Sequence, residues 1–229
     1  MARLARVVVP GLPHHVTQRG NGRARVFFSD DDYRLYLRLL TENCARARVA
    51  CLAYVLMPNH VHLVLVPKDE DGLRRALAAT HGTFAALVNA RRKRSGHFWQ
   101  GRFGCVAMDG AHAEAAMRYV LLNPVRARLA EKPEAWAWSS AVALLKDRGD
   151  GLTDVAAATE RFGKIRMLLG EMPDKEEMEA LEQALRRAES IGRPLGSESF
   201  LNRLEMKLNR QLKPAKRGRK PAAPTDATE

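Results

Sequence analysis

The spacing of apolar residues over the first fifty positions predicts one strand followed by one helix. Residues 14–21 form the expected strand, and the helix is expected to begin after Ser29. Ser29 and Asp32 have the spacing of a capping box, in which the two side chains bond to each other's backbone N–H groups. The buried stripe of this helix, with residues three or four positions apart, is expected to comprise Tyr33, Tyr36, Leu37, Leu40 and Cys44.

Two apolar runs separated by only two residues predict a β-hairpin. The strands are expected at residues 50–57 and 60–67, and Pro58 and Asn59 form the tight turn. A second helix is expected from about Asp71 to the basic cluster that ends at residue 94. Its buried stripe is predicted to comprise Leu73, Leu77, Thr80, Phe84, Leu87 and Val88.

A short strand at residues 105–108 and a third helix at about residues 111–122 complete the first half of the chain. Pro124 is expected to stop this helix. The resulting order is β-α-β-β-α-β-α. It predicts an α+β protein with a ferredoxin-like split βαβ antiparallel sheet, helices on one face of that sheet, and one added helix.

The composition changes after this region, which suggests a separate extension. Two or three modest helices are expected between residues 150 and 190, followed by a helix with a capped start at Ser197 or Ser199. The tail is expected to be disordered because of its composition. We therefore predict a first domain at residues 1–145, a helical C-terminal extension at 146–212 and a disordered basic tail at 213–229.

The charge balance points to a polyanionic partner. The chain of 229 residues has 38 Lys and Arg against 26 Asp and Glu, a net charge of +12 and a pI near 10.1. Nucleic acid is the commonest partner of so basic a protein. The alternative is a basic surface that is merely solvated, so the clustering of the charges has to decide.

Cysteine usage and hydropathy indicate a cytoplasmic protein without membrane association. Cys44, Cys51 and Cys105 show no C-x-x-C spacing and are best explained as reduced thiols in the core. The N-terminal apolar run stops at Pro10 and is therefore too short for a signal peptide. No later segment is long enough to span a bilayer.

Two histidines in the hairpin are candidate metal ligands. His60 and His62 are two residues apart in a strand, so their side chains point to one face of the sheet. Alone, such a pair more often consists of ordinary sheet residues. Tyr119 and Asn123 lie four residues apart, on one side of the third helix. An Asn in this position is by itself more often a helix cap than a ligand, and only the combination with the two histidines favours a catalytic metal site.

Three motifs follow one another along the chain: NHVHLVL at residues 59–65, FWQGRF at 98–103 and RYVLLNPVRA at 118–127. Together they resemble the single-tyrosine transposases of the HUH endonuclease superfamily, and among these the REP-associated tyrosine transposases. The resemblance runs from about Pro10 to Ser140, with the motifs in the family's order.

The resemblance implies a role for each matching residue. His60 and His62 would bind a divalent metal, Mg²⁺ or Mn²⁺, and Asn123 would complete the metal site. Tyr119 would be the nucleophile that cleaves single-stranded DNA and forms a 5′-phosphotyrosine. The substrate would be hairpin DNA at REP-like palindromes, and the protein would act as a monomer or a homodimer, with the long extension favouring the monomer.

Basic residues surround the candidate site and continue in the tail, which favours phosphate contacts over a solvated face. The tail also resembles an AT-hook core, although such tails often only add non-specific affinity. The aromatic residues of the 98–103 segment could stack bases or could simply anchor the next strand. The predicted DNA-binding residues are Arg19, Arg23, Arg102, Arg118, Arg126, Lys216, Arg217 and Arg219. The helical extension at residues 146–212 is also predicted to bind DNA.

Two other functions remain open. A catalytically silent, sequence-specific DNA-binding protein could have kept the fold, although it would have no need of His60, His62, Tyr119 and Asn123 together. An RNA-binding ferredoxin-like domain would be expected to expose aromatic residues on its central strands, where the sequence offers only Tyr54.

Overall fold

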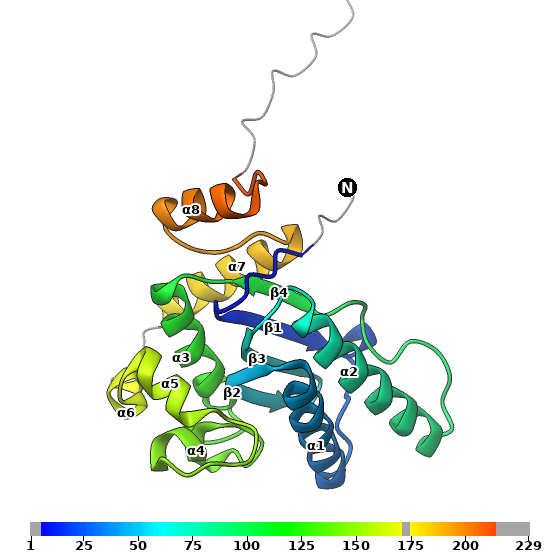
Figure 1. The fold of residues 1–229 in the computed structure, drawn as a ribbon. Coiled ribbons are helices and arrows are strands. Elements are labelled where there is room, and N and C mark those ends of the chain that lie inside the picture. Colours follow the sequence, from blue (N-terminus) through cyan, green and yellow to red (C-terminus); the bar gives the residue numbers. More distant parts are fainter. Residues whose placement is uncertain (1–5, 171–174, 214–229) are drawn as a thin grey trace, which may run out of the picture.

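The computed structural model describes residues 6–170 and 175–213, which form a four-stranded antiparallel sheet with helices on both faces (Figure 1). The strand order is β2-β3-β1-β4, the order of the ferredoxin-like sheet predicted from the sequence. The elements of this part are β1 (His14–Arg19), α1 (Asp30–Ala47), β2 (Val49–Met57), β3 (His60–Pro67), α2 (Gly72–Arg91), β4 (Gly104–Ala107) and α3 (Gly110–Arg126).

Beyond residue 140, the described residues are mostly helical, as predicted. The helices are α4 (Ala141–Lys146), α5 (Val155–Phe162), α6 (Ile165–Leu169), α7 (Lys175–Ile191) and α8 (Glu198–Leu208). Ser197 caps α8, because its Oγ accepts a hydrogen bond from the Phe200 amide at 3.3 Å. Of these helices only α4 was not anticipated. The predicted boundary at residue 145 stays a prediction, and the tail beyond Lys213 lies outside the described residues.

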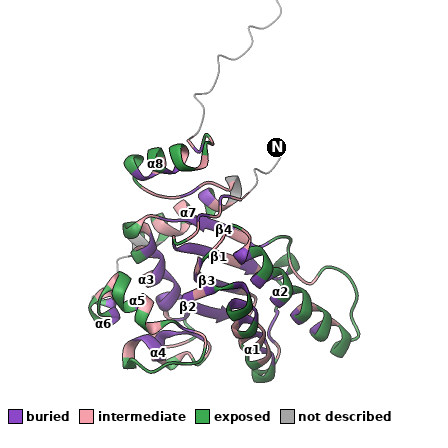
Figure 2. Cartoon of the chain, in the orientation of Figure 1, coloured by how far each residue is buried: buried purple, intermediate pink, exposed green. Residues whose placement is uncertain are grey.

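The sheet separates two buried clusters of side chains. Its strands are coloured mostly as buried in Figure 2. Alternate residues of each strand point to opposite faces, so Leu63 packs on the side of α1 and α2 whereas Val64 packs on the side of α3. The predicted capping box of α1 is present, with the Phe28 and Ser29 amides both donating to Asp32 Oδ2. The three cysteines are buried and form no disulfide.

Two predictions about helices were wrong. Leu87 is 48% exposed, because it lies one position off the buried line that Phe84 and Val88 follow on α2. Pro124 does not stop α3, which continues to Arg126. The carbonyls of Asn123 and Pro124 accept hydrogen bonds from the next turn, at 3.0 Å from the Ala127 amide and 2.9 Å from the Leu129 amide. Proline therefore removes only its own donor here.

Both outer strands of the sheet are paired with other parts of the chain. At β2, the Leu56 amide donates to the Trp138 carbonyl at 2.8 Å, and the Ser140 amide donates to the Tyr54 carbonyl at 3.0 Å. At β4, the Leu195 amide donates to the Ala107 carbonyl at 2.8 Å. Within the described ranges, no helix has the length and apolar character needed to cross a membrane.

Candidate active site

The register between β1 and β3 places the two predicted metal ligands on the face covered by α3. Arg19 pairs with His60, and Thr17 pairs with His62. The ring centroids of the two histidines are 4.8 Å apart, so the predicted side-by-side arrangement is present. His62 is 5% exposed, and His60 is partly buried.

Both histidines are neutral at physiological pH. Burial lowers the pKa of His60 to about 3, with a further contribution from the nearby Arg19 and Arg186, and burial holds the pKa of His62 well below its usual value. The His60 Nδ1–H donates to Asn59 Oδ1 at 2.6 Å, and Asn59 Nδ2 in turn donates to the Arg23 carbonyl at 3.1 Å. This chain of bonds leaves His60 Nε2 unprotonated, as a metal ligand requires.

Helix α3 brings Tyr119 and Asn123 to the same place. The predicted apolar face of this helix is fully buried against the sheet and consists of Ala113, Ala116, Met117, Val120 and Leu121. Tyr119 lies beside this face and is 4% exposed, with its ring edge-on to His62 at a centroid distance of 5.2 Å. Side-chain hydrogen bonds join the Tyr119 hydroxyl to Asn123 and to Arg126.

The groups around Tyr119 shift its pKa in opposite directions. Burial, and then the carboxylate of Glu182, raise the pKa of Tyr119 above its ordinary value, whereas Arg126 and the hydrogen bond from Asn123 lower it. The Arg126 guanidinium lies 5.1 Å from the Tyr119 ring centroid, and its Nη2 donates to Glu182 Oε2 at 3.0 Å. Tyr119 is therefore a phenol at neutral pH, with one basic group placed to stabilise its phenolate.

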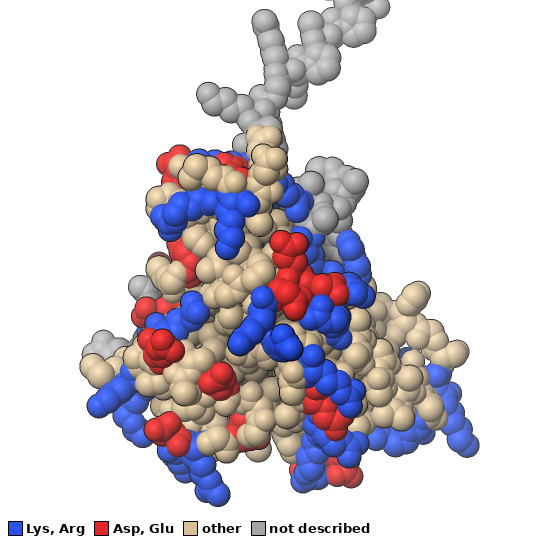
Figure 3. All heavy atoms as spheres, viewed as in Figure 1, with Lys and Arg blue, Asp and Glu red and all other residues tan. Residues whose placement is uncertain are grey.

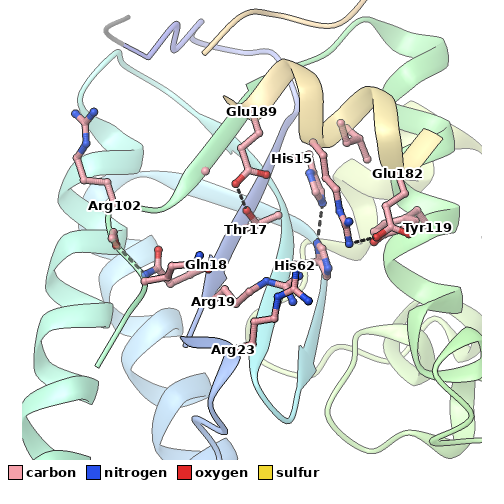
Figure 4. A pocket seen from close by; sticks show the side chains of 15 residues that line it. His15, Thr17, Gln18, Arg19, Arg23, His62, Arg102, Tyr119, Glu182 and Glu189 are labelled. Atoms are coloured by element: carbon pink, nitrogen blue, oxygen red, sulfur yellow. Dashed lines mark hydrogen bonds and ion pairs between the residues drawn. The ribbon is translucent and has the colours of Figure 1, made fainter. Parts of the chain in front are cut away.

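A pocket of about 490 Å³ opens beside these residues (Figure 4). Tyr119 and His62 line it together with three of the predicted DNA-binding residues, Arg19, Arg23 and Arg102. Arg118 is half-buried on α3 and lies outside the lining. On the face shown in Figure 3, Lys and Arg side chains are spread widely and cover more of the surface than Asp and Glu. The predicted Lys216, Arg217 and Arg219 lie outside the described residues.

The sequence reasoning missed His15 on β1. Its Nε2 is 3.0 Å from His62 Nδ1, and the two rings are nearly parallel with centroids 5.1 Å apart. The sequence contained part of the information needed to find it, because His15, Thr17 and Arg19 are alternate residues of one strand and share a face of the sheet. Only the pairing of Thr17 with His62, however, places it beside the hairpin.

Helix α7 was also missed as part of this site. Glu182, Leu185, Arg186 and Glu189 line the pocket from α7, and Thr17 Oγ1 donates to Glu189 Oε1 at 2.6 Å. Gly104 allows this close approach, since a Cβ there would lie 1.8 Å from Glu189 Oε1. Nothing local in the sequence of α7 indicates that it packs over a sheet formed by residues so distant along the chain.

The aromatic residues of the 98–103 segment anchor the chain to α2. Trp99 Nε1 donates to the His81 carbonyl at 2.9 Å, and its ring lies 6.0 Å from that of Phe84. Phe103 is 8% exposed. Of the two interpretations left open by the sequence, this packing favours the anchoring one.

The residue types fit a divalent cation, since His60 and His62 are neutral imidazoles and Asn123 on α3 carries an amide. Of these three residues, only His62 lines the pocket. Among the residues that the structure describes, no group of three or more His, Cys, Asp or Glu side chains could hold a metal ion.

Comparison with known proteins identifies one matching family. The family model described as "Transposase IS200 like" matches residues 8–123, just over half of the chain, and its match ends at Asn123. It thus contains all four strands together with Tyr119. A search of curated proteins gave no match.

Two solved structures are similar to this chain. One is described as the REP-associated tyrosine transposase bound to a REP hairpin; it has 19% sequence identity and a TM-score of 0.54, and the match covers 68% of this chain and 90% of that one. At this identity the likeness establishes a shared fold. The other is a putative transposase from Deinococcus radiodurans R1, with 16% identity, a TM-score of 0.37 and coverage of 56% and 92%. That score is too low to support a shared fold.

Proposed function

The chain belongs to the IS200-like transposase family, and we propose that it is a metal-dependent endonuclease and strand transferase acting on single-stranded DNA. The observation that carries this proposal is the position of Tyr119. Its ring lies 5.2 Å from that of His62 and lines a pocket that also contains Arg19, Arg23 and Arg102. A hydroxyl nucleophile, two neutral imidazoles and phosphate-binding arginines are the components that this reaction needs.

In the proposed reaction the Tyr119 oxygen attacks a backbone phosphorus in line with the bond to the 3′ oxygen. The new O–P bond forms as the phenol releases its proton to water. The bond between phosphorus and the 3′ oxygen breaks, and the 3′ oxygen takes up a proton from water. The products are a 5′-phosphotyrosine and a free 3′-hydroxyl. Because a phosphodiester replaces a phosphodiester, a 3′-hydroxyl can later reverse the step and rejoin a strand without ATP.

The residues around Tyr119 have separate tasks in this proposal. Arg126 and Asn123 orient the Tyr119 hydroxyl through their hydrogen bonds, and Arg126 stabilises negative charge as the phenolate develops. His60, His62 and Asn123 would hold Mg²⁺ or Mn²⁺, which when bound polarises a non-bridging phosphate oxygen. The low pKa values of the two histidines keep both imidazoles neutral for this purpose at neutral pH.

The proposed substrate is DNA that presents a hairpin next to a single strand. The solved relative with the same fold is described as bound to a REP hairpin, and by likeness we propose REP-like palindromes as the DNA recognised here. Arg19, Arg23 and Arg102 would contact the backbone of the strand that enters the pocket, so binding should weaken with rising salt. Arg118, Lys216, Arg217 and Arg219 are proposed to contact phosphates farther away.

A catalytically silent DNA-binding protein is the second candidate, and one observation favours it. The carboxylates of Glu182 and Glu189 line the same pocket as Tyr119 and would repel a phosphate. The Arg126 guanidinium is also already paired with Glu182. A binding protein that had lost cleavage could tolerate both features.

Formation of a covalent adduct separates the two candidates. The full-length protein is mixed with labelled REP-like hairpin DNA and Mn²⁺, and the product is analysed on a denaturing gel. Wild type should give a denaturant-resistant protein–DNA band that Tyr119→Phe abolishes. Tyr33→Phe is the matched control, because Tyr33 is equally buried but packs against Phe27 and Trp138.

The contrary outcomes are equally clear. Bands of equal intensity from wild type and Tyr119→Phe would refute Tyr119 as the nucleophile. Tight hairpin binding by wild type without any adduct, in Mn²⁺ or Mg²⁺, would favour the silent DNA-binding protein.

A further inference from the structure

His15 is the one histidine of the pocket to which the proposed chemistry gives no task. It lies on β1, is 2% exposed and points toward the same pocket as His62 (Figure 4). Its Nε2 lies 3.0 Å from His62 Nδ1. Its other ring nitrogen, Nδ1, is buried without a hydrogen-bond partner. A buried nitrogen without a partner costs free energy whether or not it carries the proton, so this nitrogen alone does not decide which imidazole donates.

Only one proton can occupy the hydrogen bond between the two imidazoles. Either His62 Nδ1–H donates to His15 Nε2, or His15 Nε2–H donates to His62 Nδ1. In the second case the remaining proton of neutral His62 is on Nε2, and His62 then has no free lone pair for a metal. A His62 that binds a cation through Nε2 must therefore be the donor, and His15 must be the acceptor.

The neighbouring ligand is held in the corresponding way. His60 Nδ1–H donates to Asn59 Oδ1 at 2.6 Å, which leaves His60 Nε2 as the free nitrogen. With His15 as the acceptor for His62, both histidines would carry their proton on Nδ1 and present Nε2. The two imidazoles then offer the same nitrogen from one face of the sheet.

We propose that His15 is a positioning residue that accepts the Nδ1–H of His62 and thereby presents His62 Nε2 to a divalent cation. The inference rests on the proposed function, since it takes His62 to be a metal ligand. The two rings are nearly parallel, with an interplanar angle of 19°, so the hydrogen bond between them also fixes the plane of His62. His15 meets the Tyr119 ring edge-on at 6.1 Å, so it holds ligand and nucleophile in one packed arrangement.

Two substitutions separate the hydrogen bond from the packing. His15→Phe keeps a flat ring in this position but has no acceptor, whereas His15→Gln keeps an acceptor oxygen. His14→Phe is the control for disturbance of β1, because His14 is equally buried but its ring bonds to the Val9 amide and the Leu12 carbonyl. Thermal unfolding establishes that each full-length variant is folded.

The first measurement needs neither metal nor DNA. In metal-free protein labelled with ¹⁵N at histidine, the nitrogen chemical shifts should show His62 protonated on Nδ1 and bare on Nε2. The same nitrogens in His15→Phe should show a mixture of the two tautomers, and His15→Gln should restore the wild-type pattern. A His62 protonated on Nε2 in the wild type would overturn the proposal.

The second measurement is Mn²⁺ binding by calorimetry. His15→Phe should bind Mn²⁺ about 10- to 100-fold more weakly than wild type, as is usual on loss of an outer partner, and His15→Gln should recover most of the loss. If His15→Phe binds like wild type, the positioning role is refuted and the proposed function stands. If wild type binds no Mn²⁺ and forms no DNA adduct, both fail.

Discussion

Two tyrosine–histidine pairs lie on opposite faces of the sheet and differ in their surroundings more than in their chemistry. On the side of α1 and α2, the Tyr36 hydroxyl is 2.9 Å from His81 Nε2 and the ring centroids are 6.0 Å apart. On the side of α3, the rings of Tyr119 and His62 are 5.2 Å apart. All four residues are buried, and burial raises the pKa of both tyrosines and lowers the pKa of both histidines.

What differs is access and charge. The Tyr36–His81 pair is enclosed, since Trp99 donates to the His81 carbonyl and Phe84 packs against the Tyr36 ring. The Tyr119–His62 pair lines a pocket of about 490 Å³ together with arginines. A perturbed pKa therefore does not identify a site in this protein, and an open pocket with convergent basic groups is the more informative feature.

Acid should reveal what the two faces share. Burial lowers the pKa of His15 to about 4 and that of His81 to about 3, whereas both are near 6.5 in the unfolded chain. Below pH 6.5 the unfolded state binds more protons, so stability is lost as the pH falls toward 4. At pH 5 the loss should be of the order of 2 kcal/mol for each such imidazole.

Urea unfolding at pH 7 and pH 5 measures this effect. His81→Gln should show a smaller loss than wild type, by the share of one imidazole. An equal loss in the two proteins would mean that His81 does not titrate below its ordinary range in the folded state.

The effect of substitution on metal binding should distinguish His62 from His81. His62→Ala should weaken Mn²⁺ binding by at least about 100-fold, since loss of an outer partner alone costs about 10- to 100-fold. His81→Ala should leave the Mn²⁺ affinity unchanged while lowering the melting temperature, because it leaves the buried Tyr36 hydroxyl without its partner. Calorimetry on both variants tests this difference. Equal Mn²⁺ affinities of the two variants would contradict the assignment of His62 as a metal ligand.

Substitution of Arg126 tests the effect of the positive charge that lies beside Tyr119. Arg126→Gln should raise the pKa of Tyr119, because the guanidinium stabilises the phenolate. The rate of adduct formation at pH 7.5 should fall roughly 10- to 100-fold, the usual value of a charged hydrogen bond. Arg128→Gln removes the same charge two residues later, from an exposed position, and should change the rate little. Equal decreases would indicate a general loss of DNA attraction instead.

The smallest expected effect concerns the two hydroxyls. Tyr36→Phe should lower the free energy of unfolding by about 1 to 2 kcal/mol, because His81 Nε2 loses its partner in an enclosed site. Tyr119→Phe should cost less than this, since water in the pocket can replace its hydrogen bonds. Chemical denaturation of both variants gives the comparison, and a greater loss in Tyr119→Phe would reverse it.

Short-range patterns were sufficient to predict most of the sheet and about half of the residues that the structure brings together at the candidate site. The hairpin depends on two adjacent apolar runs, and the pairing of Tyr119 with Asn123 depends on one turn of helix. Both are properties of neighbouring residues, which a sequence displays directly. The wrong prediction for Leu87 shows the limit even here, because spacing alone does not define how wide a buried stripe is.

The missed residues all depend on contacts between distant segments. His15 meets His62 only because β1 and β3 pair in one register, and a shift of one residue would turn His15 to the other face. Glu189 meets Thr17 across 172 positions of the chain. No local pattern in α7 or in β1 indicates that the two elements pack together, so their contact is known only from the tertiary structure.

The pairing at both borders of the sheet limits how copies of this chain can associate. An unpaired outer strand offers N–H and C=O groups to any extended segment that arrives, including the same strand of a second copy. Here Trp138 and Ser140 already form backbone hydrogen bonds with β2, and Leu195 forms one with β4. A continuous sheet shared between two molecules would first require these segments to detach. Any dimer that forms without such unfolding must join through helices and loops.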